Sequence, residues 1–169
     1  VRKYVLEIKS LRRHVWLFVA SFCITVYQYF AVAFMAEATG GGSHIHPTIG
    51  QHIVFDKVHL NEGNGYHSNH GTFIAPTSGL YVFSFGCTAR LGSDRRTHIH
   101  MKQNGMWIGY IFFDNMAAGF YQKESESIVA YLHIGDEVWI EITEAIGSVE
   151  IATETMHTFF SGYLIKGDS

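Results

Sequence analysis

Two His-x-His pairs, at residues 44–46 and 98–100, are the side chains in this sequence best suited to bind a metal. Residues two apart on a strand project from the same face, so such a pair can supply two metal ligands. A catalytic metal site would also need a nearby carboxylate and a further histidine, and the first acid after His100 is Asp114, beyond a predicted hairpin. We therefore predict solvated surface histidines, with a zinc or copper ion picked up from solution as the alternative.

Signatures of common catalytic sites are missing from the sequence. It contains no Gly-x-Ser-x-Gly motif of a serine nucleophile, and no Lys-Ser or Lys-Thr follows the glycines at 40–42 to make a phosphate-binding loop. Glu124 and Glu126 lie on one face of a predicted strand but close to a loop, as expected of a solvated edge. The sequence therefore predicts a protein that is not an enzyme and that needs no cofactor.

The densest charge of any predicted loop lies at residues 93–96 and continues onto the strand that follows. On that strand, polar side chains alternate with Ile99 and Met101, so the polar ones share one face. A local cationic patch on a mildly acidic protein suits anionic sugars, phosphates or lipid head groups. The predicted ligand-binding residues are Asp94, Arg95, Arg96, His98, His100 and Lys102. The alternative is a solvated turn beside a solvated strand.

The composition narrows the class of protein. The 169 residues suffice for one domain with a sizeable core. Apolar residues make up 47% of the chain and charged residues 16%, a mix that excludes intrinsic disorder. The net charge is −3, and the sequence contains no stripe of basic residues, so we expect no nucleic-acid partner. The eleven histidines would make the protein more cationic as the pH falls.

The first 30 residues have the pattern of a secretory leader. Basic residues at 2, 3, 12 and 13 precede an uncharged run at 15–36. The end of this run reads as the first strand, and the rest is short for a membrane span. We predict a signal peptide at 1–30, a globular domain at 31–169 and a secreted, extracellular protein. The alternative is an uncleaved signal anchor, which alone would bring contact with a membrane.

The two cysteines fall in different parts of the chain. Cys23 lies in the predicted leader, so the domain keeps only Cys87 and is not a disulfide-stapled scaffold. Cys87 continues an alternating row of aromatic residues on a predicted strand. Because free cysteine is among the most buried residue types, we expect an inert, buried thiol.

Turn signals recur along residues 31–169 at the spacing of an all-β domain. The dipeptide Asn104-Gly105 between two alternating runs is the strongest of them and predicts a tight hairpin. We expect strands at residues 31–36, 49–58, 71–74, 79–91, 97–103, 106–112, 125–134, 138–145 and 158–165. No helical periodicity and no Gly-X-Y run appears in this region.

Several of these strands are apolar on both faces, notably at 79–91, 125–134 and 158–165. A two-layer sandwich buries only one face of each sheet, so the second apolar face must meet another protomer or a ligand. The residues predicted to form the core and a trimer interface are Tyr81, Phe83, Phe85, Tyr131, Phe160, Gly162 and Tyr163. We expect Gly162, which lies between aromatic residues, to allow close approach of another chain or sheet.

Several short strings occur in the order and spacing of one known family. They are residues 53–58, Gly71-x-Phe73-x-Ala75-Pro76-x-x-Gly79-x-Tyr81-x-Phe83-x-Phe85, Asn104-Gly105, Leu132-x-x-Gly135-Asp136-x-Val138-Trp139 and Phe160-Ser161-Gly162-Tyr163-Leu164. With these strings the sequence resembles the globular C1q domain of the complement C1q and tumour necrosis factor superfamily. The resemblance covers about residues 31–166, and it is to members that carry the head without a collagen stalk.

The resemblance implies a ten-stranded jelly-roll sandwich that assembles as a homotrimer or heterotrimer. It implies a secreted recognition protein that binds microbial glycans or other anionic surface ligands in innate immunity, as a lectin-like, complement-like pattern-recognition molecule. The alternatives are an extracellular signalling ligand for a cell-surface receptor and a structural protein of the extracellular matrix. Some family members bind calcium through loop oxygens. The candidate calcium-binding acids of this sequence do not align with a known calcium motif; they are Asp94, Asp114, Glu144 and Glu150.

Overall fold

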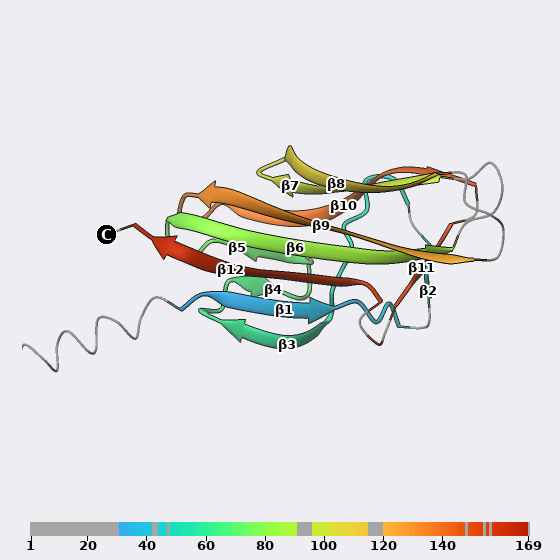
Figure 1. Cartoon of the computed structure of the whole chain (residues 1–169). Coiled ribbons are helices and arrows are strands. Elements are labelled where there is room, and N and C mark those ends of the chain that lie inside the picture. The colour runs from blue at the N-terminus through green and yellow to red at the C-terminus, as the bar shows by residue number, and fades with distance from the viewer. Residues whose placement is uncertain are drawn as a thin grey trace, which may run out of the picture. The chain divides into compact units, whose positions relative to one another are not determined.

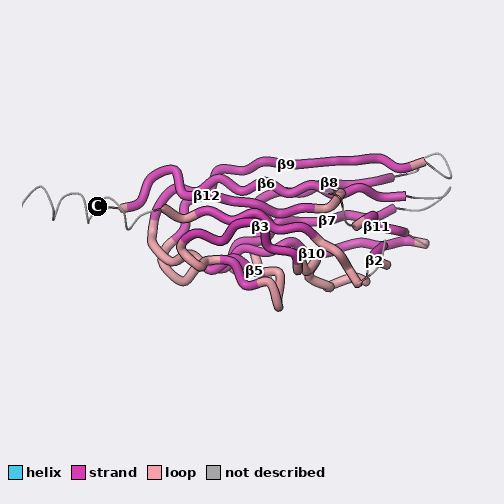
Figure 2. Tube along the Cα trace, turned by 90° about the horizontal axis from the view of Figure 1, so that it is seen from below, coloured by secondary structure: helices cyan, strands magenta, loops and turns pink. Residues whose placement is uncertain are grey.

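The described part of the chain consists of strands, whose side chains alternate between two faces, and of the loops that join them. In this computed structural model, the described residues are 31–41, 44–46, 48–90, 96–114, 120–147, 149–153, 155 and 157–168. Within these ranges the chain forms strands and loops only (Figure 2). The described ranges accordingly contain no helix that is long and apolar enough to cross a membrane.

Two antiparallel sheets contain all of the described strands. The strands are β1 (Ala33–Glu37), β2 (His44–Ile45), β3 (Lys57–Glu62), β4 (Tyr66–His67), β5 (Thr72–Ile74), β6 (Gly79–Arg90), β7 (Arg96–Gln103), β8 (Met106–Asp114), β9 (Tyr121–Leu132), β10 (Glu137–Ile146), β11 (Glu150–Ala152) and β12 (Phe159–Gly167). The five-stranded sheet has the order β4-β5-β10-β7-β8. The seven-stranded sheet has the order β2-β11-β6-β12-β1-β3, with β9 also paired to β6 (Figure 1). The predicted all-β jelly-roll fold is confirmed.

Aromatic side chains fill the space between the two sheets. On β6 the inward residues Tyr81, Phe83 and Phe85 are fully buried, as is Phe160 on β12. Phe34 of β1 packs edge-on against Phe160 with 4.8 Å between the ring centroids. Such aromatic pairs contribute about 0.5–1.5 kcal/mol beyond the area that they bury. This core determines which face of each strand points outward.

The Asn104-Gly105 hairpin is confirmed. Both residues have a positive φ, 49° and 86°, as the two central positions of a type I′ turn require. The turn joins β7 to β8 with Gln103 opposite Met106. The other long strands also lie within a few residues of their predicted positions.

The predicted strand at residues 49–58 is wrong for most of its length. β3 begins only at Lys57, and the residues before it run beside β10 with irregular hydrogen bonds. Ile53 N donates to the carbonyl oxygen of Ile140 at 2.9 Å, and Ile142 N donates to that of Gln51 at 3.0 Å. Of the apolar residues that suggested a strand, Ile53 and Phe55 are nevertheless buried. The short strands β2, β4 and β11 were not predicted, since two or three residues leave no periodic signal.

Gly162 of β12 allows close packing within its own chain. An added Cβ atom there would lie 2.5 Å from Cδ1 of Phe83 and 2.8 Å from Cε1 of Phe34. Both rings belong to the buried core. The close approach that we predicted for Gly162 is therefore to aromatic rings of the same chain, on the two strands that flank β12 in its own sheet.

Candidate functional site

Alternation along β7 brings the predicted polar residues to one side of the five-stranded sheet. Ile99 and Met101 are fully buried, so their neighbours on the strand point the opposite way, toward solvent. On β10, Ile140 and Ile142 are buried in the same manner. We call the outward side of these two strands the polar face. Its residues are Arg96, His98, His100 and Lys102 of β7 and Glu141, Thr143 and Glu144 of β10.

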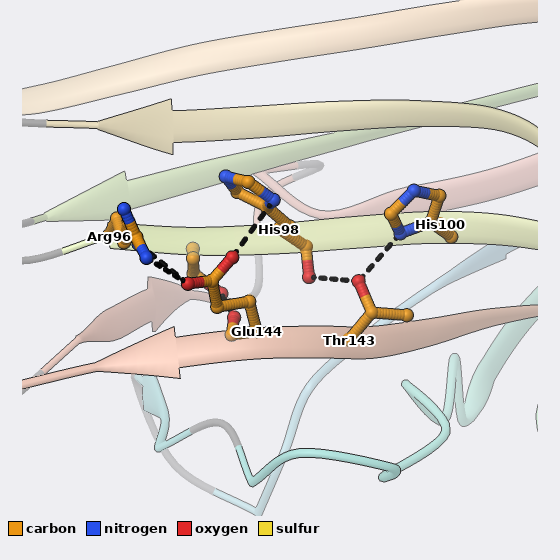
Figure 3. Close-up of polar contacts among 6 residues, drawn as sticks. Arg96, His98, His100, Thr143 and Glu144 are labelled. Carbon is orange, nitrogen blue, oxygen red and sulfur yellow. Dashed lines mark hydrogen bonds and ion pairs between the residues drawn. The ribbon is translucent and has the colours of Figure 1, made fainter.

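A β-bulge in β10 gives the polar face two consecutive side chains. The register with β7 shifts between Ile142 and Glu144, which leaves Thr143 without a partner on β7. An inserted residue of this kind bends the strand and re-aims its side chains. Figure 3 shows the result, since both Thr143 and Glu144 contact residues of β7.

The cations of the polar face have carboxylate partners on β10. Glu144 lies 2.6 Å from Arg96 and 3.2 Å from Nδ1 of His98 (Figure 3). Nζ of Lys102 lies 2.6 Å from Oε1 of Glu141. We predicted a cationic patch, but these acids balance the arginine and the lysine at neutral pH. The face gains net positive charge only when its histidines are protonated.

Glu141 joins three segments of the chain. Its Oε2 accepts a hydrogen bond from Nε1 of Trp139 at 3.0 Å and lies 3.8 Å from Nε2 of His52. Burial opposes ionisation of this carboxyl, but hydrogen bonds from Lys102 and Trp139 outweigh it and hold the pKa of Glu141 below its usual value. The carboxylate therefore stays charged and fixes the side chains around it.

His100 is the most buried side chain of the polar face, with 8% of its surface exposed. Its Nδ1 lies 2.6 Å from the hydroxyl oxygen of Thr143, which lies 3.2 Å from the carbonyl oxygen of His98. A hydroxyl has one proton, so both hydrogen bonds form only if Thr143 donates to the carbonyl and accepts from Nδ1–H. Neutral His100 therefore carries its proton on Nδ1. Burial lowers the pKa of His100, with His98 and Lys102 adding to the effect.

Aromatic side chains of β8 stack on both sides of His100. Its ring centroid lies 4.2 Å from that of Trp107 and 5.5 Å from that of Tyr110, and Phe112 stacks on Tyr110 at 6.0 Å. The register between β7 and β8 shifts beside Met101, so β8 contains an extra residue. This bulge puts Trp107 and Tyr110, three positions apart, on the same side. We call Trp107, His100, Tyr110 and Phe112 the aromatic column.

Proteins of a known family are similar in sequence to this chain over most of the described residues. The C1q domain profile matches residues 33–165. This chain belongs to the C1q domain family. The A-type polypeptide of the complement C1q subcomponent of Rattus norvegicus is 35% identical over 126 residues, which are 70% of this chain and 48% of that protein. The collagen alpha-1(X) chain of Mus musculus is 26% identical over 131 residues, which are 73% of this chain and 18% of that protein. The chain thus spans less than half the length of these C1q-domain relatives.

Solved structures agree with the C1q fold. The globular domain of zebrafish complement 1qA protein matches with a TM-score of 0.61 and 18% identity, over 81% of this chain and 99% of that one. Murine APRIL at pH 5.0 matches with a TM-score of 0.62 and 12% identity, over 80% of this chain and 99% of that one. At such identities the likeness shows the fold alone.

The sequence predicted only part of this face of the C1q domain. Asp94 and Arg95 lie outside the described residues, and the other four predicted ligand-binding residues do share one face. The acids of β10 and the aromatic residues of β8 were missed as members of the site. The two-residue turn could have predicted that Trp107 lies opposite Lys102, but not the bulge that follows.

The candidate calcium ligands do not converge in the part of the C1q domain that the structure describes. Asp94 lies outside that part, Glu144 is bound to the cations of the polar face, and Glu150 lies 3.5 Å from Arg90. Among the described residues, which include both His-x-His pairs, no three His, Cys, Asp or Glu side chains are placed to hold a metal ion.

The residues predicted for the core and the trimer interface separate into two groups. Those that point into the sandwich are Tyr81, Phe83, Phe85, Phe160 and Gly162. Tyr131 and Tyr163 point the other way and are about half exposed. Val129 lies opposite Val82, which also lies opposite Tyr163, so apolar side chains are continuous across β9, β6 and β12. We call this outward side the apolar face. Its residues are Leu80, Val82, Val129, Tyr131 and Tyr163.

Proposed function

We propose that this C1q-family chain is a secreted recognition protein that binds anionic ligands, such as acidic microbial glycans, as a trimer. The polar face is the observation that carries the proposal. Its arginine and lysine are balanced by two carboxylates at neutral pH, and the face gains positive charge when its histidines are protonated in acid. The ligand would contact Arg96 at one end of β7, Arg95 next to it in the sequence, and His98 when that side chain is protonated. Three such faces in one trimer would raise the overall affinity through effective concentration.

Binding of sulfated or sialylated oligosaccharides on a glycan array tests this anion site. Retention should increase when the pH is lowered from about 7.5 to about 5.5, and it should fall with added salt. The double variant Arg95→Ala/Arg96→Ala should lose most of the binding and stay folded. Arg90→Ala is the matched control, because Arg90 is also a surface arginine beside a glutamate but lies on the seven-stranded sheet. Equal binding by the parent and the double variant, with no response to pH or salt, would remove the site.

The apolar face supports the proposed trimer. Val129 of β9 is 60% exposed on this face, and a contiguous exposed apolar surface marks an interface. Val129→Asp should therefore convert a trimer into folded monomers, as measured by light scattering. Ile49→Asp is the control, because Ile49 is 61% exposed but lies in a turn outside the face. A parent protein that is monomeric at micromolar concentration would contradict the proposal.

Secretion would follow from removal of the predicted leader. Expressed from a chain that includes residues 1–30, the protein should collect in the medium without them, whereas an intact membrane-bound species would favour the signal anchor. A receptor pull-down from cell surfaces separates the alternatives for the trimer. Capture of a cell-surface receptor, together with an empty glycan array, would favour a signalling ligand over a recognition protein.

A further inference from the structure

Two bulges on neighbouring strands act on one spot of the polar face. The bulge in β8 brings Trp107 to the same side as Tyr110, and the bulge in β10 brings Thr143 beneath His100. Each bulge interrupts a ladder of backbone hydrogen bonds, and bulges are over-represented beside functional sites, where they re-aim a side chain. The result is an imidazole held by a hydrogen bond from below and by aromatic rings on both sides.

His100 offers one unused hydrogen-bonding atom at this spot. Nδ1 is committed to Thr143, while Nε2 has no partner among the described residues. No fully buried side-chain nitrogen or oxygen atom in the described ranges lacks a partner, so Nε2 must reach solvent. Because the proton of neutral His100 lies on Nδ1, Nε2 presents a lone pair. The side chain is more than nine-tenths buried, yet it presents a single acceptor at the surface.

The surroundings of Nε2 suit a neutral ligand rich in hydroxyl groups. Lys102 is already bound to Glu141, so no free charge competes for the ligand at neutral pH. Tyr110 and Phe112 of the column are about half exposed, so their rings are accessible to a ligand bound at Nε2. Trp107 closes the column and is 66% exposed, which leaves its indole available for contact with the C–H groups of a sugar.

We propose that the aromatic column is a carbohydrate subsite in which a hydroxyl group of a neutral sugar donates a hydrogen bond to Nε2 of His100. The subsite rests on the proposed recognition function but differs from the anion site in its ligand, since the anion site needs positive charge and this subsite needs a lone pair. The ring of the sugar lies against Trp107. Tyr110 holds the other side of the imidazole.

The two sites respond to acid in opposite directions. Protonation of His100 removes the Nε2 lone pair, so the hydrogen bond donated by the sugar hydroxyl is lost and binding that depends on it falls as the pH falls. The groups that face His100 are His98 and Lys102 on β7, Tyr110 on β8 and Glu141 on β10; the cations oppose protonation and Glu141 favours it. Burial and the cations prevail, so the neutral form persists below the ordinary histidine pKa of about 6.5. Affinity should therefore be steady near neutrality and lost only at lower pH.

A glycan array with neutral mannose, glucose, galactose and N-acetylglucosamine oligosaccharides tests the subsite. We expect retention of at least one neutral oligosaccharide at about pH 7.5, little change with salt, and loss at acidic pH. His100→Asn keeps a donor for Thr143 but removes Nε2, and it should weaken binding about tenfold, the effect of one hydrogen bond to a ligand. Trp107→Ala should weaken it by a similar factor. Met106→Ala is the matched control, because Met106 is the exposed neighbour of Trp107 outside the column.

Nitrogen NMR of the imidazole of His100 gives a readout that does not depend on a variant. In the parent protein at about pH 7.5, Nδ1 should be protonated, and the Nε2 resonance should move when the retained oligosaccharide is added. No neutral oligosaccharide on the array, unchanged binding by His100→Asn, or a proton on Nε2 would each overturn the subsite. Retention of acidic glycans only, abolished by Arg95→Ala/Arg96→Ala, would leave the anion site and refute this one. Retention of neutral glycans only, unaffected by Arg95→Ala/Arg96→Ala, would support this subsite and refute the anion site.

Discussion

Replacing Gly162 with alanine should destabilise the C1q domain from inside its core. The added Cβ would lie 2.5 Å from Cδ1 of Phe83 and 2.8 Å from Cε1 of Phe34, whereas carbon atoms in contact normally lie about 3.5–4.0 Å apart. The overlap is thus about 1 Å against two rings that are buried among other aromatic residues. Overpacking of this size costs about 1–3 kcal/mol. Alanine recovers about 0.5–1 kcal/mol because it loses less backbone entropy than glycine. We expect a net loss of about 1–2 kcal/mol in the free energy of unfolding.

Gly109→Ala provides the contrast for this experiment. The added Cβ would meet Cδ1 of Ile128 even more closely, but that atom is the end of a flexible side chain that is only partly buried. A rotamer change in Ile128 costs about 0.5–1.5 kcal/mol, so the net change should stay near zero once the gain of alanine is counted. Urea denaturation of both variants at one protein concentration measures the difference, since the proposed assembly would couple to unfolding. A greater loss for Gly109→Ala than for Gly162→Ala would refute the view that the rigidity of the neighbouring atom, rather than its distance, decides the cost.

Three further predictions concern the polar face and the buried thiol of Cys87. Thr143→Val should lower the free energy of unfolding by about 1–3 kcal/mol, because Nδ1–H of His100 loses its hydrogen-bond acceptor. Thr143→Ser keeps the hydroxyl and should cost much less. Equal urea midpoints for the two variants would contradict this prediction. The pKa of His100 is lower in the folded protein, so on acidification the unfolded chain takes up this proton first. The free energy of unfolding that is present above about pH 6.5 should therefore fall as the pH drops through the folded-state pKa of His100. Because the pKa of Glu141 is also lowered, the free energy of unfolding should keep falling below pH 4.5, the usual pKa of this carboxyl. Urea midpoints that rise on acidification would have the wrong sign. Burial raises the pKa of Cys87 to about 12, so iodoacetamide should label this thiol only after unfolding, and mass spectrometry that finds the native protein labelled would contradict it.

Local patterns predicted most of the strands. The alternating aromatic residues of the long strand β6 predict it directly. The Asn104-Gly105 turn predicts the hairpin of β7 and β8, which follows β6 in the chain. The failure at residues 49–58 has a physical reason. Ile53 and Phe55 are buried as in a strand, but the segment forms hydrogen bonds with β10 only at irregular points.

The direction of a doubly apolar strand could not be predicted from that strand alone. On β12, Phe159 and Phe160 are consecutive, and only packing against Phe34 makes Phe160 the inward one. The predicted core and interface residues were therefore a mixture of both faces. Tertiary packing separated them, because it buries one row of aromatic residues and leaves Tyr163 and Tyr131 outside.

The candidate site was predicted where it depends on one strand and missed where it depends on two. Period-two alternation places His98 and His100 on one face without knowledge of any neighbour. The partners Thr143 and Glu144 are reached only through the cross-strand register, and a bulge shifts that register by one residue. No local signal marks the bulge, so the cationic patch expected from the sequence became a balanced face in the structure.

The two outward faces of the sandwich differ in how their side chains are satisfied. On the polar face, Glu141 and Glu144 bind the neighbouring cations, so the surface is stable in water without a partner. On the apolar face, Val129 and Tyr163 have only water over them in a single chain, and covering them with another copy would release that water. Assembly through the apolar face would leave every polar face exposed. A trimer built in this way presents three identical ligand sites, and the weak, shallow contacts that one aromatic column can make would then suffice for tight binding to a repetitive glycan surface.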